Sequence, residues 1–325
     1  MLPLIADVSE LSEQVHLTPE LLFRISRCSS LFYREIQRTK KDGSIRIIHC
    51  PSVPTRAAQT WILRRILETV PLEDSATGFR TGINILTNAL RHRDNPFMMC
   101  LDVRDFFPSV GHFRVYAVYR ELGYSPHVSH VLTSICTFNG RLPQGGVTSP
   151  ALSNIVCRSL DRRILGYAIR HSLSYTRYAD DITLSGNDPK TLWRAKRTVA
   201  RILAEEGFTL NETKTRILGP GARRLVTGIV IGDLPNGGKS VGVGRDVRRR
   251  VRAMIHHSRR ACLIEENPGQ LDRKIAGWLA HLSSVDVAGR EQLDRYMTKM
   301  VTPAAIAPAQ SDHGAPGEPL QSDPD

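Results

Sequence analysis

The segment from Leu173 to Ser185 constrains the fold more than any other, because it is typical of a β-hairpin with acidic side chains at its tip. Both halves are rich in β-branched and aromatic residues, and apolar and polar side chains nearly alternate along them. A tight turn therefore falls near Ala179-Asp180, within Tyr178-Ala179-Asp180-Asp181. The two adjacent aspartates can simply form that turn. Their carboxylates are also ligands that Mg²⁺ prefers, so a metal site on an antiparallel sheet is the alternative.

A third carboxylate follows another stretch of strand length. Phe97–Leu101 is an apolar run, and Asp102 comes directly after it. If this strand pairs with the hairpin, Asp102 and Asp180 converge, and the main-chain carbonyl of Val103 completes an oxygen-rich site. Two divalent ions about 3.5–4 Å apart can hold the attacking and leaving oxygens of a phosphoryl transfer. The alternative is that Asp102 caps a helix or lies in a turn, a role that suits Asp105 better.

The charge of the chain points to an anionic partner. The 325 residues carry a formal net charge of +12, and the isoelectric point is near 9.7. Residues 301–325 contain four acids and no Lys or Arg, so the first 300 residues are more basic, at +16. Nucleic acid is the commonest partner of a basic chain, although a basic surface can also serve solubility alone.

Cysteine spacing and hydropathy exclude other classes of protein. The six cysteines are scattered without a Cys-x-x-Cys pair, which argues against a zinc site or a disulfide framework. The N-terminal residues lack a basic segment followed by a long apolar one, and no run is long enough to span a membrane. The sequence therefore predicts a cytoplasmic protein with no membrane partner.

Apolar periodicity predicts helices around the strands. Residues 1–32 fit two short helices, and residues 33–49 fit a hairpin with a turn at Lys41–Ser44. Further helices are predicted at Gln59–Val70, Arg114–Leu122, Val128–Phe138, Ala151–Ser172 and Lys190–Glu206, and then at Leu271–Leu282 and Glu291–Met300. A second hairpin is predicted after Val226, with its turn at Pro235–Gly238.

Residues 245–260 form the most basic segment. They carry seven arginines and one aspartate, with an apolar stripe of helical period at Val247, Val251, Met254 and Ile255. Such a helix buries one face and either binds phosphates with the other or is simply solvated there.

The order of motifs along the chain resembles that of a reverse transcriptase. The motifs are Lys40–Ile48, Pro51 and the helix with Gln59, the Asp102 strand, Leu142–Pro150 with Leu152-Ser153-Asn154, the Tyr178–Asp181 hairpin, and Gly207–Asn211 with Lys214. Two further motifs are similar to those of bacterial retron-type enzymes: Asn88-Ala89-Leu90-Arg91-His92 and Val226-Thr227-Gly228. The resemblance spans about Tyr33 to Ile231.

The resemblance implies an α+β fold, a right-hand polymerase with fingers, an antiparallel palm sheet and a helical thumb. N-terminal helices and fingers would occupy residues 1–96, and the palm would occupy 97–238 with an interleaved fingers segment at about 111–150. The helical thumb would follow at 239–300. Residues 301–325 hold five prolines and little apolar mass, so we expect a disordered tail.

The resemblance also implies catalytic roles. Asp102, Asp180 and Asp181 would hold two Mg²⁺ ions, with Mn²⁺ as an alternative and the Val103 carbonyl as a further ligand. One ion would activate the 3′-hydroxyl of the growing strand, and the other would carry the triphosphate. No dedicated protein base is then required.

Two cations and one aromatic residue would bind the incoming nucleotide. Arg46 and Lys41 resemble cations that grip the triphosphate, although each can also be ordinary surface charge. Phe107 would stack under the sugar and disfavour a 2′-hydroxyl, which makes dNTPs the substrates. Phe106 is expected to pack in the core.

Three later residues complete the nucleotide site. Gln144 and Gly145 would line the nucleotide and template pocket, where glycine permits a close backbone approach. Lys214 would lie near the leaving pyrophosphate, with an ordinary helix-end lysine as the alternative. The family usually has Ala-Pro where this chain has Gly146-Val147, a change that removes a conformational restraint from the loop.

Nucleic-acid recognition would involve two groups of residues. The resemblance assigns contacts with a structured RNA to Asn88, His92, Val226, Thr227 and Gly228. Spacing alone would instead make Asn88 a helix cap and His92 an ordinary surface residue. The basic helix adds Arg248, Arg249 and Arg252, which would follow an RNA backbone.

As a retron enzyme the protein would copy a cognate noncoding RNA into cDNA from an internal guanosine 2′-hydroxyl. The product would be a branched RNA–DNA hybrid (msDNA), and the role would be antiphage defence with an effector or toxin protein as partner. The alternatives are another prokaryotic reverse transcriptase, such as a group II intron maturase, a diversity-generating or a defence-associated enzyme, and a catalytically silent RNA-binding scaffold. The sequence does not specify the oligomeric state.

Overall fold

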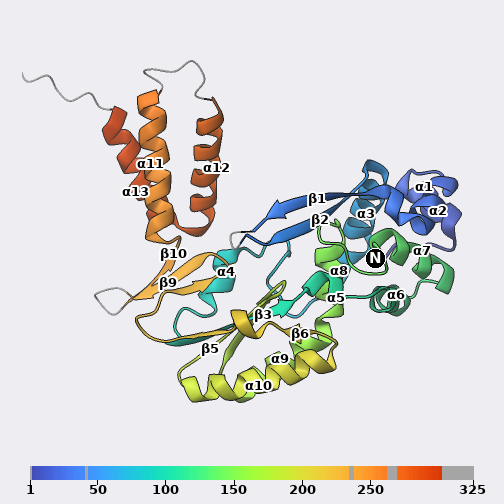
Figure 1. The fold of residues 1–325 in the computed structure, drawn as a ribbon, viewed down its shortest axis with the longest axis horizontal. Helices are drawn as coiled ribbons and strands as arrows, with labels where there is room; N and C mark the ends of the chain where they lie inside the picture. Colours follow the sequence, from blue (N-terminus) through green and yellow to red (C-terminus); the bar gives the residue numbers. More distant parts are fainter. Residues whose placement is uncertain (1, 41–42, 234–237, 262–268, 302–325) are drawn as a thin grey trace, which may run out of the picture. The chain divides into compact units, whose positions relative to one another are not determined.

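The computed structural model describes residues 2–40, 43–233, 238–261 and 269–301 (Figure 1). Lys41, most of the predicted turn at Pro235–Gly238 and the predicted disordered tail from residue 302 onward lie outside the described residues. The chain divides into two compact units, one of residues 1–247 with 284–286 and one of 248–283 with the residues after 286. The predicted thumb begins at residue 239, whereas the second unit begins at Arg248.

The first unit is built around an antiparallel sheet in the order β4-β5-β3-β6, with β7 also paired to β3. The strands are β3 (Phe97–Arg104), β4 (Ser174–Tyr178), β5 (Asp181–Gly186), β6 (Thr209–Leu210) and β7 (Arg216–Leu218). Helices and antiparallel strands therefore share this unit, as the predicted α+β class requires. Two helices, α9 (Arg158–Arg170) and α10 (Pro189–Glu205), pack against the sheet (Figure 1).

Helix α10 confirms the predicted amphipathic pattern. Asp188 caps it by accepting hydrogen bonds from the N–H groups of Lys190 and Thr191, both at 3.0 Å. Its inward face is buried at Leu192, Ala195, Val199 and Leu203. Burial of this stripe against the sheet is what stabilises the helix.

The single long helix predicted at Ala151–Ser172 is wrong. The chain forms α8 (Ser149–Val156) and α9, which meet at the buried Cys157. The N–H of Cys157 bonds to the carbonyls of both Ile155 and Ser153, a bifurcated bond typical of a helix end. Both helices bury apolar residues, so the apolar pattern continues across the junction. The pattern therefore does not show where α8 ends and α9 begins.

The helix predicted at Gln59–Val70 lies earlier in the chain, as α3 (Val53–Arg65). Its Pro54 stands in the first turn, where a fixed φ favours helix and the missing N–H costs nothing. A separate 3₁₀ turn at Leu67–Thr69 follows it. Gln59 therefore lies in the middle of α3, where it is completely buried.

The N-terminal part combines a hairpin with short helices. The predicted hairpin is confirmed as β1 (Tyr33–Thr39) and β2 (Ile45–Pro51). The two predicted helices of residues 1–32 are confirmed as α1 (Val8–Val15) and α2 (Pro19–Arg27), and a 3₁₀ turn (Ser29–Phe32) follows. Helices α6 (His112–Glu121) and α7 (Pro126–Cys136) lie beside them in Figure 1.

A second small sheet has the order β10-β9-β8. It comprises β8 (Arg224–Val226), β9 (Ile229–Asp233) and β10 (Lys239–Gly242), all antiparallel. Helix α4 (Ile85–Leu90) contacts each of these strands. The remaining short elements are α5 (Phe106–Ser109) and a 3₁₀ turn at Glu212–Lys214.

The last three helices lie side by side in Figure 1: α11 (Arg245–Ala261), α12 (Gly269–Val285) and α13 (Val287–Val301). The predicted apolar stripe of α11 is confirmed, since Val251 and Ile255 are buried. In the described part of the chain, no helix is long and apolar enough to cross a membrane.

Candidate active site

The acidic tetrapeptide forms the predicted tight turn between β4 and β5. Tyr178 pairs with Asp181 across the hairpin, which leaves Ala179 and Asp180 as the two turn residues. Ala179 has φ of +56°, a left-handed conformation that a residue with a side chain seldom adopts outside such turns. The prediction of a hairpin tip with two adjacent carboxylates is confirmed.

Strand β3 brings the third carboxylate to this turn. Asp102 is the direct cross-strand partner of Asp181, and the N–H of Val103 donates to the Asp180 carbonyl at 3.0 Å. Directly paired residues on antiparallel strands have Cβ atoms about 5 Å apart. The predicted convergence of the two strands at their acidic residues is therefore confirmed.

Burial and mutual repulsion make the ionised forms of the carboxylates in this cluster less stable. Burial raises the pKa of Asp180, and the negative charge of Asp102 raises it further. Burial, followed by the charges of Asp180 and Asp102, raises the pKa of Asp181 to about 6. Each carboxylate thus makes the ionised form of its neighbour less stable, and a bound divalent cation would remove that penalty.

The side chains of Lys214 and Asn211 both contact the Asp102 carboxylate. The ammonium of Lys214 lies 2.9 Å from Asp102 Oδ1, and the Asn211 amide donates to Oδ2 at 3.1 Å. This contact raises the pKa of Lys214. Among the residues that the structure describes, no three His, Cys, Asp or Glu side chains form a ready-made metal cage.

The donor set nevertheless fits magnesium. All three side chains at the turn offer carboxylate oxygens, which Mg²⁺ prefers, and no soft sulfur or imidazole ligand stands among them. For Asp102 to contact a metal through Oδ1, its carboxylate would have to give up its contact with Lys214.

A buried ion pair, which no local sequence pattern predicts, fixes the strand that leads into the turn. Arg177 and Asp161 are both fully buried and form two hydrogen bonds of 2.6 and 2.7 Å. Nη1 of Arg177 also donates to the carbonyl of Ala179 at 3.2 Å and to Asn154 Oδ1 at 3.1 Å. The guanidinium therefore holds the turn that carries Asp180.

Three aromatic rings lie together beside the aspartates. Phe79 is 5.5 Å from the Tyr178 ring and 6.5 Å from the Phe107 ring, measured between centroids. Phe79 is about half exposed at 49% and has φ of +58°. The expectation that Phe106 packs in the core is confirmed, while Phe107 is only half-buried.

Two of the segments that carry predicted nucleotide-binding residues, β2 with Arg46 and the loop with Gln144 and Gly145, contact each other. Arg46 lies on the exposed part of β2, and its positive charge lowers the pKa of Asp180, which opposes the effect of burial. The carbonyl of Gln144 accepts the N–H of His49, also on β2, at 2.8 Å. A Cβ on Gly145 would lie 2.8 Å from the His49 carbonyl oxygen, so only glycine fits there.

The reading of His92 as a surface residue is wrong. Its side chain is completely buried, and its two ring nitrogens lie 2.7 Å from the hydroxyls of Ser185 and Thr176. Burial, reinforced by the charge of Arg91, lowers the pKa of His92 to about 3, so the ring is neutral. A direct contact between this imidazole and RNA, as predicted, is incompatible with its burial, because its partners belong to the hairpin strands.

The two retron-like motifs meet at one turn. Thr227 and Gly228 connect β8 to β9, and both have positive φ, at +46° and +88°. The amide of Asn88 donates to the Thr227 hydroxyl at 3.4 Å, a long hydrogen bond. Asn88 is buried and is not the cap of its helix, since Asn84 holds that position. Val226 is buried next to this turn.

Comparison with known proteins decides the family. The family model for reverse transcriptase (RNA-dependent DNA polymerase) matches residues 38–231. The chain is 35% identical to the Retron Ec86 reverse transcriptase of Escherichia coli over 301 residues, which cover 92% of this chain and 91% of that protein. The chain belongs to the retron reverse transcriptases. It is thus an RNA-directed DNA polymerase.

Two longer relatives support the same family. The chain is 35% and 34% identical to the Retron Mx65 and Mx162 reverse transcriptases of Myxococcus xanthus. These matches cover 79% and 83% of this chain but only 62% and 61% of the relatives. The chain therefore spans about three fifths of these two proteins.

The basic helix of this reverse transcriptase belongs to the second unit. Arg249 and Arg252 are exposed on α11, and Arg248 is half-buried. The guanidinium of Arg252 lies 4.2 Å from the centre of the Tyr296 ring on α13, a cation–π contact. That contact orients one arginine of the helix.

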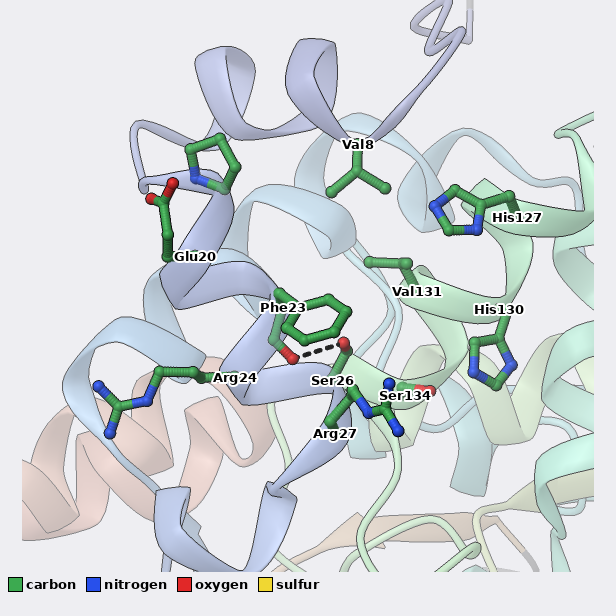
Figure 2. Close-up of a pocket in the computed structure, with 11 residues that line it drawn as sticks. Val8, Glu20, Phe23, Arg24, Ser26, Arg27, His127, His130, Val131 and Ser134 are labelled. Carbon is green, nitrogen blue, oxygen red and sulfur yellow. Dashed lines mark hydrogen bonds between the residues drawn. The ribbon is translucent and has the colours of Figure 1, made fainter.

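A cavity of about 950 Å³ lies away from the aspartates of this enzyme, between α1, α2 and α7 (Figure 2). Phe23 and Arg27 border it, with the guanidinium 5.3 Å from the centre of the ring. None of the predicted site residues lines this cavity.

Proposed function

We propose that this reverse transcriptase makes a branched RNA–DNA hybrid (msDNA) from a cognate noncoding RNA. The observation that carries its catalytic part is the direct cross-strand pairing of Asp102 with Asp181, beside the turn that holds Asp180. In this proposal the central sheet is the palm, the β1-β2 hairpin and the N-terminal helices are the fingers, and α11–α13 form the thumb.

Asp102, Asp180 and Asp181 would hold two Mg²⁺ ions, or Mn²⁺ in their place, with the Val103 carbonyl as a further oxygen ligand. The ions would supply activation of the attacking 3′-hydroxyl and charge neutralisation on the triphosphate. The raised pKa values of Asp180 and Asp181 support this role, since burial first, and then the charge of the neighbouring carboxylates, makes their ionised forms less stable without a cation. Lys214, released from Asp102, would be free to balance charge on the departing pyrophosphate.

Arg46, Lys41, Gln144 and Gly145 would bind the triphosphate and base from the fingers side. Phe107 would pack against the sugar and exclude a 2′-hydroxyl, so that dNTPs are the substrates. Its half-buried position, with Phe106 on one side and Phe79 on the other, supports that role, because neighbouring rings hold it in one orientation.

Recognition of the RNA would use two separate surfaces. Asn88 supports the exposed turn at Thr227-Gly228, and His92 would act by holding β4 and β5 together rather than by touching RNA. On α11, Arg248, Arg249 and Arg252 would bind the backbone. An antiphage role in the cytoplasm with an effector protein completes the proposal, which follows from the retron relatives.

The test incubates purified protein with the noncoding RNA encoded beside its gene, dNTPs and Mg²⁺. We expect cDNA joined to RNA through a 2′-linkage, and Asp180→Asn should abolish it. Asp105→Asn is the matched control, because Asp105 is exposed three residues after Asp102 and makes no capping hydrogen bond. Extension of a generic primer without branched product would favour another prokaryotic reverse transcriptase. No extension on any template would favour the silent scaffold.

A further inference from the structure

The side chain of Gln59 hydrogen-bonds the Pro143–Ser149 loop to the rest of the protein. This loop carries Gln144 and Gly145. Gln59 lies on α3 and is completely buried. Its Oε1 accepts the N–H of Val147 at 3.0 Å, and its Nε2 donates to the Ile135 carbonyl at 2.8 Å and to the Tyr33 hydroxyl at 2.7 Å. One amide thus joins α3, α7, β1 and the loop.

The orientation of this amide is determined by its partners. A main-chain carbonyl can only accept, and a main-chain N–H can only donate. Ile135 therefore requires the nitrogen of Gln59 on its side, and Val147 requires the oxygen. A flipped amide would break both bonds in a buried place.

The Val147 N–H exists because this chain departs from the family pattern. The usual Ala-Pro would put proline at position 147, and proline has no N–H to donate. Gly146 fits the same arrangement: a Cβ there would lie 2.6 Å from Ser149 Oγ, which donates to the Pro143 carbonyl at 2.8 Å. The loss of proline therefore does not leave the loop unrestrained.

Two hydrogen bonds, one on each side of Gly145, connect the loop to the rest of the protein. The Gln144 carbonyl accepts the N–H of His49, and the Val147 N–H donates to Gln59. The two anchors are also linked through packing, because the rings of His49 and Tyr33 both contact Phe138, at 4.7 and 4.9 Å between centroids. Hydrogen bonds and ring contacts therefore fix the loop relative to the β1-β2 hairpin.

We propose that Gln59 is a positioning residue for the incoming nucleotide, acting through the Val147 N–H in place of the proline that the family usually has. It touches no substrate. Its contribution is to hold the loop in the geometry that binds the dNTP, which makes KM for the nucleotide more sensitive to its loss than kcat. The inference rests on the proposed role of Gln144 and Gly145 in nucleotide binding.

The test is a double-mutant cycle of Gln59→Leu and Val147→Pro in the full-length protein. Steady-state incorporation of dTTP on poly(rA)·oligo(dT) gives KM and kcat. We expect each single variant to raise KM for dTTP by about tenfold, the effect of about 1.4 kcal/mol, with a smaller change in kcat. In the Gln59→Leu background, Val147→Pro should add little, because the bond is already lost.

Two comparisons separate positioning from misfolding. Val147→Ala retains the N–H and should raise KM much less than Val147→Pro does. Val287→Pro introduces a proline at the start of α13, far along the chain, where the first helical turn tolerates it. Hydrogen exchange provides a readout that does not depend on activity: the Val147 amide should be protected in the wild type and exchange faster in folded Gln59→Leu.

Additive effects on KM, or an unchanged exchange rate at Val147 in Gln59→Leu, would overturn the proposal. If the loop does not bind nucleotide at all, the outcome differs: the exchange rate at Val147 changes while KM for dTTP stays at its wild-type value. That second result would count against the nucleotide role of Gln144 and Gly145 rather than against the hydrogen bond.

Discussion

Replacing Arg177 by Met should destabilise the first unit severely, because it leaves a buried carboxylate without its partner. Arg177 and Asp161 are both within 1% of complete burial, and their two hydrogen bonds measure 2.6 and 2.7 Å. After the substitution, the hydroxyl of Tyr175 would be the one donor to the Asp161 side chain left among the residues that the structure describes. Breaking one side of such a pair costs about 3–5 kcal/mol, a fifth or more of the roughly 5–15 kcal/mol stability of a typical domain.

Urea unfolding followed by circular dichroism measures this loss, and thermal unfolding should show a drop of roughly 6–20 °C. The neutral double variant Arg177→Met with Asp161→Asn should recover about 1–3 kcal/mol relative to Arg177→Met alone, since no uncompensated charge remains. The surface control is Arg163→Met, whose exposed ion pairs with Glu205 and Glu206 should matter little for the unfolding midpoint.

Polymerase activity should fall further than stability explains. At a temperature where Arg177→Met remains folded, the Ala179 carbonyl lacks its donor, and the turn that carries Asp180 is less well fixed. We expect activity to fall about tenfold or more, in line with the loss of one positioning contact. An unfolding free energy within 1 kcal/mol of the wild type, or a double variant no more stable than Arg177→Met, would refute the reasoning.

Three further outcomes are expected. Because the folded state raises the pKa of Asp181 to about 6, above its ordinary value of 3.8, the metal-free protein should gain stability as pH falls from about 6 to 4. Because Asp181 is partly open to solvent, screening limits the gain to about 1 kcal/mol, and Asp181→Asn should remove the part of the pH dependence that Asp181 contributes in melts with EDTA. Phe107→Ala should reduce the preference for dNTPs over ribonucleotides by about tenfold or more in single-nucleotide incorporation, and unchanged selectivity would exclude the proposed contact with the sugar. Affinity for RNA falls as salt rises, and changing Arg248, Arg249 and Arg252 to Gln should make this fall less steep. The slope of log affinity against log salt should become less negative by about 2, since each residue is proposed to make one phosphate contact. The control carries the same change at Arg170, Arg194 and Arg197.

Local pattern was enough to predict the central strands and their acidic residues. Alternation with period two identifies both hairpin strands, and a tight turn in a hairpin fixes their register. The apolar run before Asp102 reads as a central strand, which must pair on both sides, and it does so with β5, β6 and β7. Local pattern predicts that Asp102 and Asp180 converge only if the two strands pair, and it does not show that they do; the structure shows that they pair and that Asp102 lies directly opposite Asp181.

Buried polar residues could not be predicted in the same way. His92 bonds to hydroxyls 84 and 93 residues further along the chain, and Asp161 bonds to Arg177 across 16 residues. A polar side chain reads as exposed in any local pattern, because its burial depends on partners that only the tertiary fold supplies. The retron resemblance indicated a role for His92 but not its position beneath the hairpin strands. For the same reason, the sequence marks Gln59 only as part of a family motif and does not predict its buried hydrogen bonds.

The main chain at the acidic turn is fixed from two directions, and this determines how the site responds to a cation. The carbonyl of Ala179 accepts from buried Arg177, and the carbonyl of Asp180 accepts from the N–H of Val103. Repulsion among the carboxylates therefore cannot relax by movement of the strands that carry them. It can relax by proton uptake, because burial and the charges of Asp180 and Asp102 raise the pKa of Asp181, or by a counterion, such as Lys214 beside Asp102. A divalent cation would replace both at once, so that the energy stored by holding the carboxylates together becomes affinity for the metal.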